Sequence, residues 1–218
     1  FDLATGLLNR AFFTAALEHE IDRSQQSEAP LALLWIDLDR FKEVNDQFGH
    51  DAGDSVLQAT ARRLEAAVRG HDVVGRIGGD EFGVVVSDYG THAELTRVLE
   101  RVRSSIEEPI TVGGGEAIVT ASIGVSVYPG DGAHADELMR AGDSGMYSAK
   151  ADGGNAHAYF SAEMNDRADE RRRRRRDIDD AIAHDEFELY YQPIVSAADG
   201  GVWGAEALLR WNSRGSVV

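Results

Sequence analysis

Cysteine is absent from the sequence, which excludes disulfides, cysteine-ligated metal sites and thiol catalysis. A chain without cysteine fits a reducing compartment, so we expect a cytoplasmic location. The longest apolar runs, such as residues 31–36, are far too short to cross a bilayer, and no basic-then-apolar leader opens the chain. Since the first residue is Phe1 and not Met, we expect a piece of a longer protein, whose missing segments could carry a membrane anchor.

Basic residues are also scarce. The 22 lysines and arginines stand against 38 aspartates and glutamates, which gives a formal net charge of −16. A protein that binds polymeric nucleic acid normally needs a basic face, so we do not expect such a partner. Lysine itself occurs only at Lys42 and Lys150, and both residues fall inside motifs that point to function.

The 218 residues, 43% of them hydrophobic, suffice for one core and the start of a second domain. Apolar spacing predicts helices over 9–24, 41–48, 52–68, 93–106 and 135–151, and strands over 31–37, 73–77, 82–86, 110–112, 117–128 and 157–160. This order predicts an α/β (α+β) fold, with a central, mainly antiparallel sheet of the β-α-β-β-α-β kind flanked by helices.

The composition changes after residue 160. Residues 163–183 form a charged stretch with six arginines at 171–176 and acidic residues on both sides. Mixed charges favour a solvated linker helix with local ion pairs, and an RNA or lipid patch is the alternative. Two strand candidates follow at 187–195 and 202–211. We therefore predict a domain over 1–160, a linker helix over 161–185 and a truncated second domain over 186–218.

A predicted hairpin tip carries the sequence Gly78-Gly79-Asp80-Glu81. The two glycines leave no Cβ in the way, so a triphosphate can approach the main chain. Two adjacent carboxylates without a basic neighbour are electrostatically costly unless a cation is present. Taken alone, the tip fits an ordinary turn with solvated acids equally well.

A second acidic pair, Asp37 and Asp39, ends the strand predicted over 31–37. Ligands gather at the carboxyl ends of strands in α/β sheets, and a buried unpaired carboxylate is expensive. Metal coordination would remove that cost, and hard oxygen ligands select Mg²⁺, with Mn²⁺ as the alternative. Asp37, Asp80 and Glu81 would together form a two-metal phosphoryl-transfer site.

Four segments, in order, resemble the GGDEF family of diguanylate cyclases. They are residues 2–10, 37–54, 78–82 and 146–150, and the resemblance covers about residues 1–160. It implies a fold like the palm of nucleotide cyclases and polymerases. It also implies the condensation of two GTP into cyclic di-GMP and two diphosphates with Mg²⁺. Because each subunit supplies one nucleotide, two hairpins must face each other in a homodimer.

The resemblance also implies residue roles. Asp37 and Asp80 would bind metal, assisted by the carbonyl of Leu38, and Glu81 would be a further ligand or help to deprotonate the attacking 3′-hydroxyl. Asn45 and Asp54 would read guanine, since a carboxylate can accept from the N1–H and amino groups that guanine presents. The expected phosphate contacts are Lys42, Lys150, the amides of Phe41 and Lys42, the glycines Gly78 and Gly79, and Arg76. For Arg76 a solvent-facing strand position is the alternative.

Two further positions bear on activity. Gly154 stands where the family usually has an arginine, so we predict weakened but not abolished GTP binding. Arg69 and Asp72 form an Arg-x-x-Asp motif at the spacing of the family's product-inhibition site. Arginine can bind phosphate bidentately and stack on guanine, and the alternative is a surface ion pair.

The C-terminal piece resembles the start of an EAL-family cyclic di-GMP phosphodiesterase at residues 190–195 and 206–211, with Glu206 implied as a metal ligand. A complete barrel of that type needs roughly 250 residues, so this chain is not expected to hydrolyse anything by itself. Two alternatives to a cyclase stay open. One is a GTP-binding module that regulates the adjoining EAL domain. The other is a cyclic di-GMP receptor acting through Arg69 and Asp72.

Overall fold

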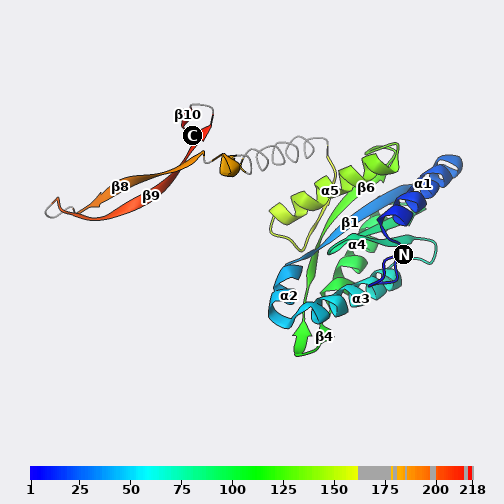
Figure 1. Cartoon of the computed structure of the whole chain (residues 1–218). Helices are drawn as coiled ribbons and strands as arrows, with labels where there is room; N and C mark the ends of the chain where they lie inside the picture. The colour runs from blue at the N-terminus through cyan, green and yellow to red at the C-terminus, as the bar shows by residue number, and fades with distance from the viewer. Residues whose placement is uncertain (162–177, 179–180, 185, 197–199, 214–215, 218) are drawn as a thin grey trace. The chain divides into compact units, whose positions relative to one another are not determined.

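The computed structural model describes residues 1–161, 178, 181–184, 186–196, 200–213 and 216–217 (Figure 1). The chain divides into two compact units, Phe1–Asn165 and Asp166–Val218. Among the described residues, no helix combines the length and apolar character needed to span a membrane. The predicted linker helix lies mostly outside the described residues, and the domain boundaries at 160 and 185 stay predictions.

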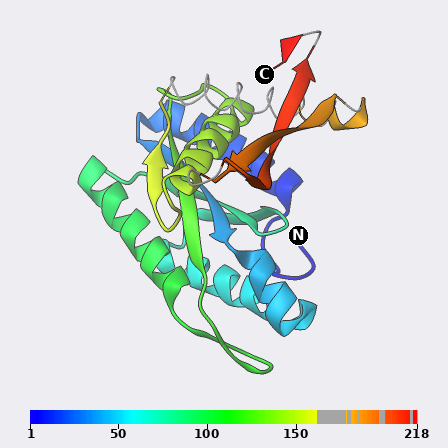
Figure 2. The same ribbon diagram turned by 90° about the vertical axis from the view of Figure 1, so that its left-hand side faces the viewer.

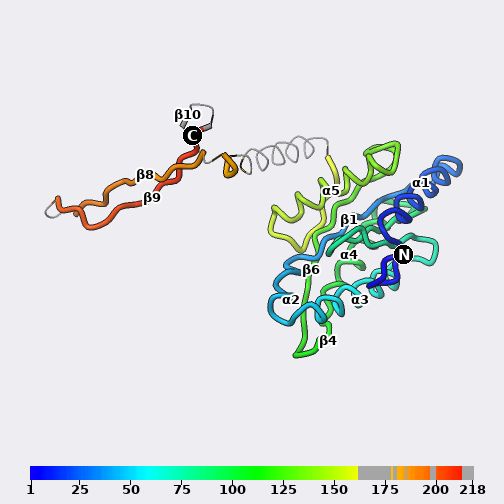
Figure 3. The backbone as a smooth tube through the Cα atoms, in the orientation of Figure 1, coloured from blue at the N-terminus to red at the C-terminus, as the bar shows by residue number. Residues whose placement is uncertain are grey.

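The first unit confirms the predicted mixed fold. Its helices are α1 (Arg10–Ser27), α2 (Phe41–Phe48), α3 (His50–Ala67), α4 (His92–Glu107) and α5 (Ala135–Ala151). Its strands are β1 (Leu31–Asp39), β2 (Val73–Gly78), β3 (Glu81–Ser87), β4 (Ile110–Val112), β5 (Gly115–Ala117), β6 (Thr120–Tyr128) and β7 (His157–Tyr159). The main sheet has the order β2-β3-β1-β6-β7, antiparallel except for the β6–β7 pair. Figure 3 traces this path, in which β1 is central.

The strand predicted over 117–128 is divided in the structure. Its first residue, Ala117, belongs to β5, which pairs with β4 in a separate two-stranded sheet. Only β6 joins the main sheet. The prediction was wrong here because Ile118, between β5 and β6, continues the apolar run in the sequence. In the structure its side chain is exposed and is not buried in either sheet.

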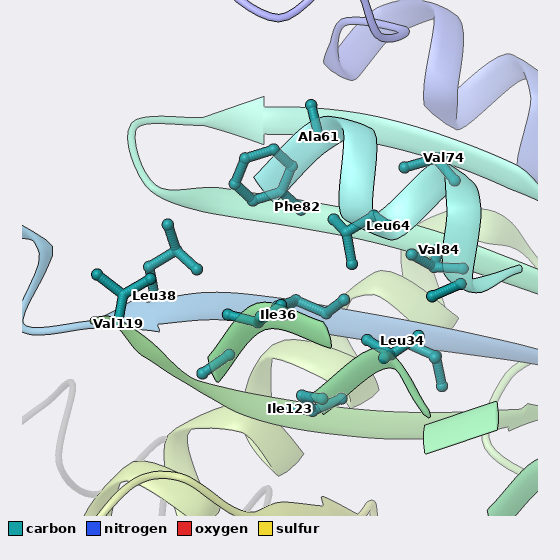
Figure 4. Packing of buried hydrophobic residues seen from close by; sticks show 14 of the residues in the cluster. Leu34, Ile36, Leu38, Ala61, Leu64, Val74, Phe82, Val84, Val119 and Ile123 are labelled. Carbon is teal, nitrogen blue, oxygen red and sulfur yellow. The ribbon is translucent and has the colours of Figure 1, made fainter. Parts of the chain in front are cut away.

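Two apolar clusters lie on opposite faces of β1 because successive side chains of a strand point to opposite sides. Leu34, Ile36 and Leu38 pack on one face with residues of α3 and α4 (Figure 4). Leu33 and Trp35 pack on the other face with residues of α1 and α5. Figure 2 shows the helices of the first unit around the sheet from a second direction. A central strand buried on both faces is therefore confirmed.

Glycines let both helices of the second face lie close to the sheet. A Cβ on Gly124 of β6 would come 1.8 Å from the carbonyl oxygen of Gly142 on α5, and a Cβ on Gly83 would come 2.5 Å from the ring of Phe13 on α1. No side chain fits at either position. Because α5 packs this closely on the sheet, Lys150, near the end of α5, reaches Asp37 at the end of β1.

The second unit contains β8 (Phe187–Val195), β9 (Val202–Ser213) and β10 (Ser216–Val217). β8 and β9 correspond to the two strand candidates, but they are not the orphan strands that we expected, because they pair with each other as an antiparallel hairpin in which Gln192 faces Glu206. Large apolar side chains such as Leu189, Tyr191 and Trp203 are exposed along it.

Candidate active site

The hairpin between β2 and β3 is tied to the end of β1. Gly79 at its tip has φ +53°, a backbone conformation that glycine adopts without strain. The backbone N–H of Leu38 donates to the carbonyl of Asp80 (3.2 Å), and Asp37 pairs with Glu81 in the β1–β3 register. The strand pairing thus places the three acidic residues Asp37, Asp80 and Glu81 at one end of the sheet.

Asp37 continues the row of β1 side chains that faces α1 and α5. It is buried, and Lys150 Nζ lies 2.7 Å from its Oδ1. Burial raises the pKa of Asp37, the neighbouring ammonium of Lys150 opposes this effect, and the charge of Asp80 adds to it. The lysine predicted to contact phosphate therefore also compensates the charge of a predicted metal ligand.

Glu81 is half-buried beside the same residues. Burial raises its pKa, and the negative charges of Asp37, Asp143 and Asp80 raise it further. Asp143 was not among the sequence-predicted residues. The signal was available, because Asp143 precedes Lys150 by seven residues, two helical turns, and so lies on the same face of α5.

The donor chemistry of this cluster fits a divalent cation. Oδ1 of Asp37 is buried and, apart from the ion pair with Lys150, accepts no well-aligned hydrogen bond. Carboxylate oxygens are among the hard ligands that Mg²⁺ prefers. Within the described ranges, however, no three acidic or histidine side chains already converge as a metal site. A cation would therefore have to draw the side chains of Asp80 and Glu81 towards Asp37.

A pocket of about 740 Å³ opens beside this cluster, between α2 and the end of α5. Its lining includes Asp39, Arg40, Lys150 and Gly154. Asp39 accepts hydrogen bonds from Ser122 Oγ (2.7 Å), Thr120 Oγ1 (2.8 Å) and the N–H of Asn155 (2.9 Å). Asp39 thus connects β6 to Asn155 and holds the loop at 153–155 in place.

The loop explains why residue 154 is a glycine here. Gly154 has φ +74°, and a Cβ on it would lie 3.1 Å from Asp39 Oδ1. A side chain at this position would be strained and would begin against a carboxylate.

The two residues predicted to bind guanine, Asn45 and Asp54, lie on the two helices α2 and α3 that meet at a corner. The side chain of Asn45 lies over Gly53, where a Cβ would come 2.0 Å from Asn45 Oδ1. Asp54 is the next residue on α3 and is exposed. At the start of α2, Arg40 adopts φ +56°, and no side chain caps the helix. The amides of Phe41 and Lys42 thus lie at an uncapped N-terminus, a suitable place for an anion.

Arg76 differs from the solvent-facing alternative. Its side chain is only 14% exposed, donates to the carbonyl of Gly79 (3.0 and 2.7 Å), and pairs with Asp2 Oδ1 at 3.0 Å. Although burial alone would raise the pKa of Asp2, hydrogen bonds from Thr5 and Arg76 lower it. Arg76 thus braces the hairpin tip against the first motif, and a phosphate contact stays a prediction.

Arg69 and Asp72 do not form the surface ion pair that was the alternative for this motif. The side chain of Asp72 is 1% exposed and accepts from the N–H groups of Arg69 (2.7 Å) and Ser87 (3.1 Å). The guanidinium of Arg69 donates to the carbonyl of Asp88 (3.2 Å). Asp72 therefore shapes the turn that presents Arg69, and a contact of either residue with cyclic di-GMP stays a prediction.

Comparisons with known proteins agree with this geometry. The model of the family described as "Diguanylate cyclase, GGDEF domain" matches residues 1–156, and the EAL domain model matches residues 175–218. Glu206, on β9, lies inside the second match.

Several relatives extend the comparison. The bifunctional diguanylate cyclase/cyclic di-GMP phosphodiesterase MucR of Pseudomonas aeruginosa is 39% identical over 210 residues, 96% of this chain and 30% of that protein. The response regulator PleD of Caulobacter vibrioides is 42% identical over 158 residues, 71% of this chain and 35% of that protein. The chain thus spans about a third of these relatives. A solved structure of TpbB (YfiN) from Pseudomonas aeruginosa, comprising only the GGDEF domain, superposes with a TM-score of 0.74 at 33% identity and covers 77% of this chain and 98% of that one.

Proposed function

Because the chain belongs to the GGDEF family of diguanylate cyclase domains, we propose that it condenses two GTP into cyclic di-GMP and two diphosphates. The observation that carries the proposal is the pairing of Asp37 with Glu81 across β1 and β3, beside a pocket that Lys150 lines. This arrangement puts buried carboxylates next to a place where a triphosphate can lie.

GTP would occupy the corner and the pocket together. Asn45 and Asp54 would take the guanine edge, while Lys42, Lys150 and the first amides of α2 would hold the phosphates. The glycines at 78 and 79 leave room for the triphosphate against the hairpin.

Asp37, Asp80, Glu81 and the carbonyl of Leu38 would hold a divalent cation such as Mg²⁺, which would stabilise the charge that develops on the phosphates. In each step a 3′-oxygen forms a bond to an α-phosphorus, and the bond from that phosphorus to diphosphate breaks. The raised pKa of Glu81 suits its carboxylate to accept the hydroxyl proton. Since one copy of the chain holds one nucleotide, the reaction requires two copies whose β2–β3 hairpins face each other.

The test is an incubation of the full chain with GTP and Mg²⁺, analysed by chromatography. We expect cyclic di-GMP from the unchanged protein and from Glu65→Ala, which removes an exposed acid of α3 outside the site. Asp80→Ala should give none. If the unchanged protein binds GTP without converting it, the chain is instead a regulatory module for the adjoining EAL segment.

We further propose that cyclic di-GMP inhibits the enzyme through Arg69. Asp72 presents this arginine on a turn at the surface, where its guanidinium can bind phosphate and stack on guanine. Titration of cyclic di-GMP should inhibit the unchanged protein more strongly than Arg69→Ala. Equal inhibition of both proteins would exclude this site.

A further inference from the structure

A second, smaller pocket is lined by Glu81 itself. It has a volume of about 330 Å³ and is lined by Glu81, by Arg10 of α1, by Trp35 of β1, and by Arg140 and Asp143 of α5, together with Asp136 and Met139. It shares no lining residue with the 740 Å³ pocket that contains Lys150. Glu81 therefore lines the smaller pocket and interacts electrostatically with Lys150, which lines the larger one.

The smaller pocket contains polar groups that its own chain does not satisfy. Arg10 and Arg140 are both exposed, and among the described residues the only electrostatic neighbour given for either is Glu137, one helical turn before Arg140. Trp35 is 5% exposed, and its buried Nε1 has no hydrogen-bond partner. A buried donor without a partner costs free energy, and two exposed guanidinium groups in the lining of the same pocket are available to bind an anionic group.

The chemistry of the proposed reaction requires such a place. Each bond forms between two nucleotides, so a second nucleotide must reach the surroundings of Glu81 after the larger pocket has taken the first. Arginine binds phosphate oxygens bidentately and tolerates partial burial better than lysine. The acidic residues Asp143 and Asp136 beside the arginines suit a ligand that also carries donors, such as ribose hydroxyls.

We propose that this pocket receives the ribose-phosphate part of the GTP carried by a second copy of the chain, with Arg140 as its main contact. The proposal rests on the proposed function. It makes the pocket a subsite that is complete only when two copies face each other, and it assigns Arg140 to the second nucleotide rather than to the first.

The experiment compares Arg140→Ala with Arg62→Ala, which removes an exposed arginine of α3 that lines neither of these two pockets. Binding of guanosine 5′-(α,β-methylene)triphosphate, a probe that cannot be converted, is measured by calorimetry, and product formation by chromatography. Arg140→Ala should bind the probe within about twofold of the unchanged protein but form product at least about tenfold more slowly, as expected for one charge-assisted contact. Arg62→Ala should match the unchanged protein in both measurements.

Sedimentation gives a second readout. With the probe and Mg²⁺, the unchanged protein should form more dimer, because each nucleotide contacts both copies, and Arg140→Ala should lose this gain. Arg140→Gln, a milder change at the same exposed position, guards against misfolding. Normal product formation by the two Arg140 variants would overturn the proposal. So would an equal loss of probe binding and product formation in these variants. A lack of product from the unchanged protein would instead overturn the proposed function.

Discussion

The two faces of the β1–β3 pair differ sharply although they share the same backbone. On the face covered by α3 and α4, Ile36, Leu38 and Phe82 are fully packed among apolar neighbours (Figure 4). On the face towards α5, Asp37 is a buried and Glu81 a half-buried carboxylate; burial raises the pKa of both, and the charges of neighbouring aspartates raise both further. Strand alternation thus separates groups that stabilise the fold from groups that are held at a cost for chemistry.

The largest expected effect on stability comes from comparing Glu81 and Phe82, two neighbouring residues of β3 whose side chains lie on opposite faces. Phe82→Ala should lower the free energy of unfolding by about 3–5 kcal/mol, because it leaves a cavity in the packed face. Glu81→Gln, one residue away, should cause no such loss. Urea unfolding followed by circular dichroism measures both. If Phe82→Ala proved as stable as Glu81→Gln, the two faces would not differ as described.

A second test concerns the charged brace at the hairpin tip. Arg76→Ala removes the ion pair with Asp2 and the hydrogen bonds to Gly79, and it should cost about 1.5–3 kcal/mol. The lowered pKa of Asp2 means that its contribution is present above the ordinary value of 3.8 and is lost as the pH falls below it. A double-mutant cycle with Asp2→Asn, measured at pH 7, should show strong coupling. Additive losses would show that the pair does not brace the tip.

The sequence predicted the fold well because β1 carries an unbroken apolar run and the helices show clear spacing. It also predicted that Asp37, Asp80 and Glu81 lie at the same end of the sheet, since the end of a strand and the tip of a hairpin can be recognised from local sequence patterns. It could not predict that Lys150 pairs with Asp37, because 113 positions separate them and only the packing of α5 on the sheet brings them together.

Other residues were misread or missed for the same reason. The partner of Arg76 is Asp2, 74 positions away, and nothing local to the motif reveals it. Asp39, the second acidic residue at the end of β1, accepts hydrogen bonds from β6 and from Asn155, partners that lie 81 and 116 positions away. Ile118 reads as part of a strand, but its side chain is exposed. Long-range side-chain pairing, rather than element type, is what local patterns leave undetermined.

A third, smaller effect is expected at Gly154 on the charged face. Gly154→Ala should lower the free energy of unfolding by about 1 kcal/mol, because φ is positive there, whereas Gly113→Ala, in open space at an ordinary φ, should be nearly neutral.

The same position tests the prediction that the missing arginine weakens GTP binding. If that prediction is right, Gly154→Arg should bind GTP more tightly than the unchanged protein, despite the strain at this position. A GTP titration checks this, and an unchanged affinity would contradict it.

The smallest expected effect is a gain in stability from removing a functional charge. In metal-free protein, Glu81→Gln should raise Tm by about 2 °C at pH 7, because the half-buried carboxylate is repelled by Asp37, Asp143 and Asp80. Differential scanning calorimetry in the presence of a chelator measures the shift. Glu65→Gln, an exposed acid of α3, is the matched control and should change Tm little.

The pH dependence of this gain distinguishes a buried carboxylate from a general surface effect. The pKa of Glu81 in the folded chain lies above its ordinary value of 4.5, so the folded protein takes up a proton at a higher pH than the unfolded chain does. The free energy of unfolding therefore falls as the pH rises through the range above 4.5. The glutamine of the Glu81→Gln variant does not titrate, so the gain in Tm should shrink as the pH is lowered from 7 towards 4.5. A gain that stayed constant over this range would show that Glu81 is not held at an electrostatic cost, and the charged face would then resemble an ordinary surface.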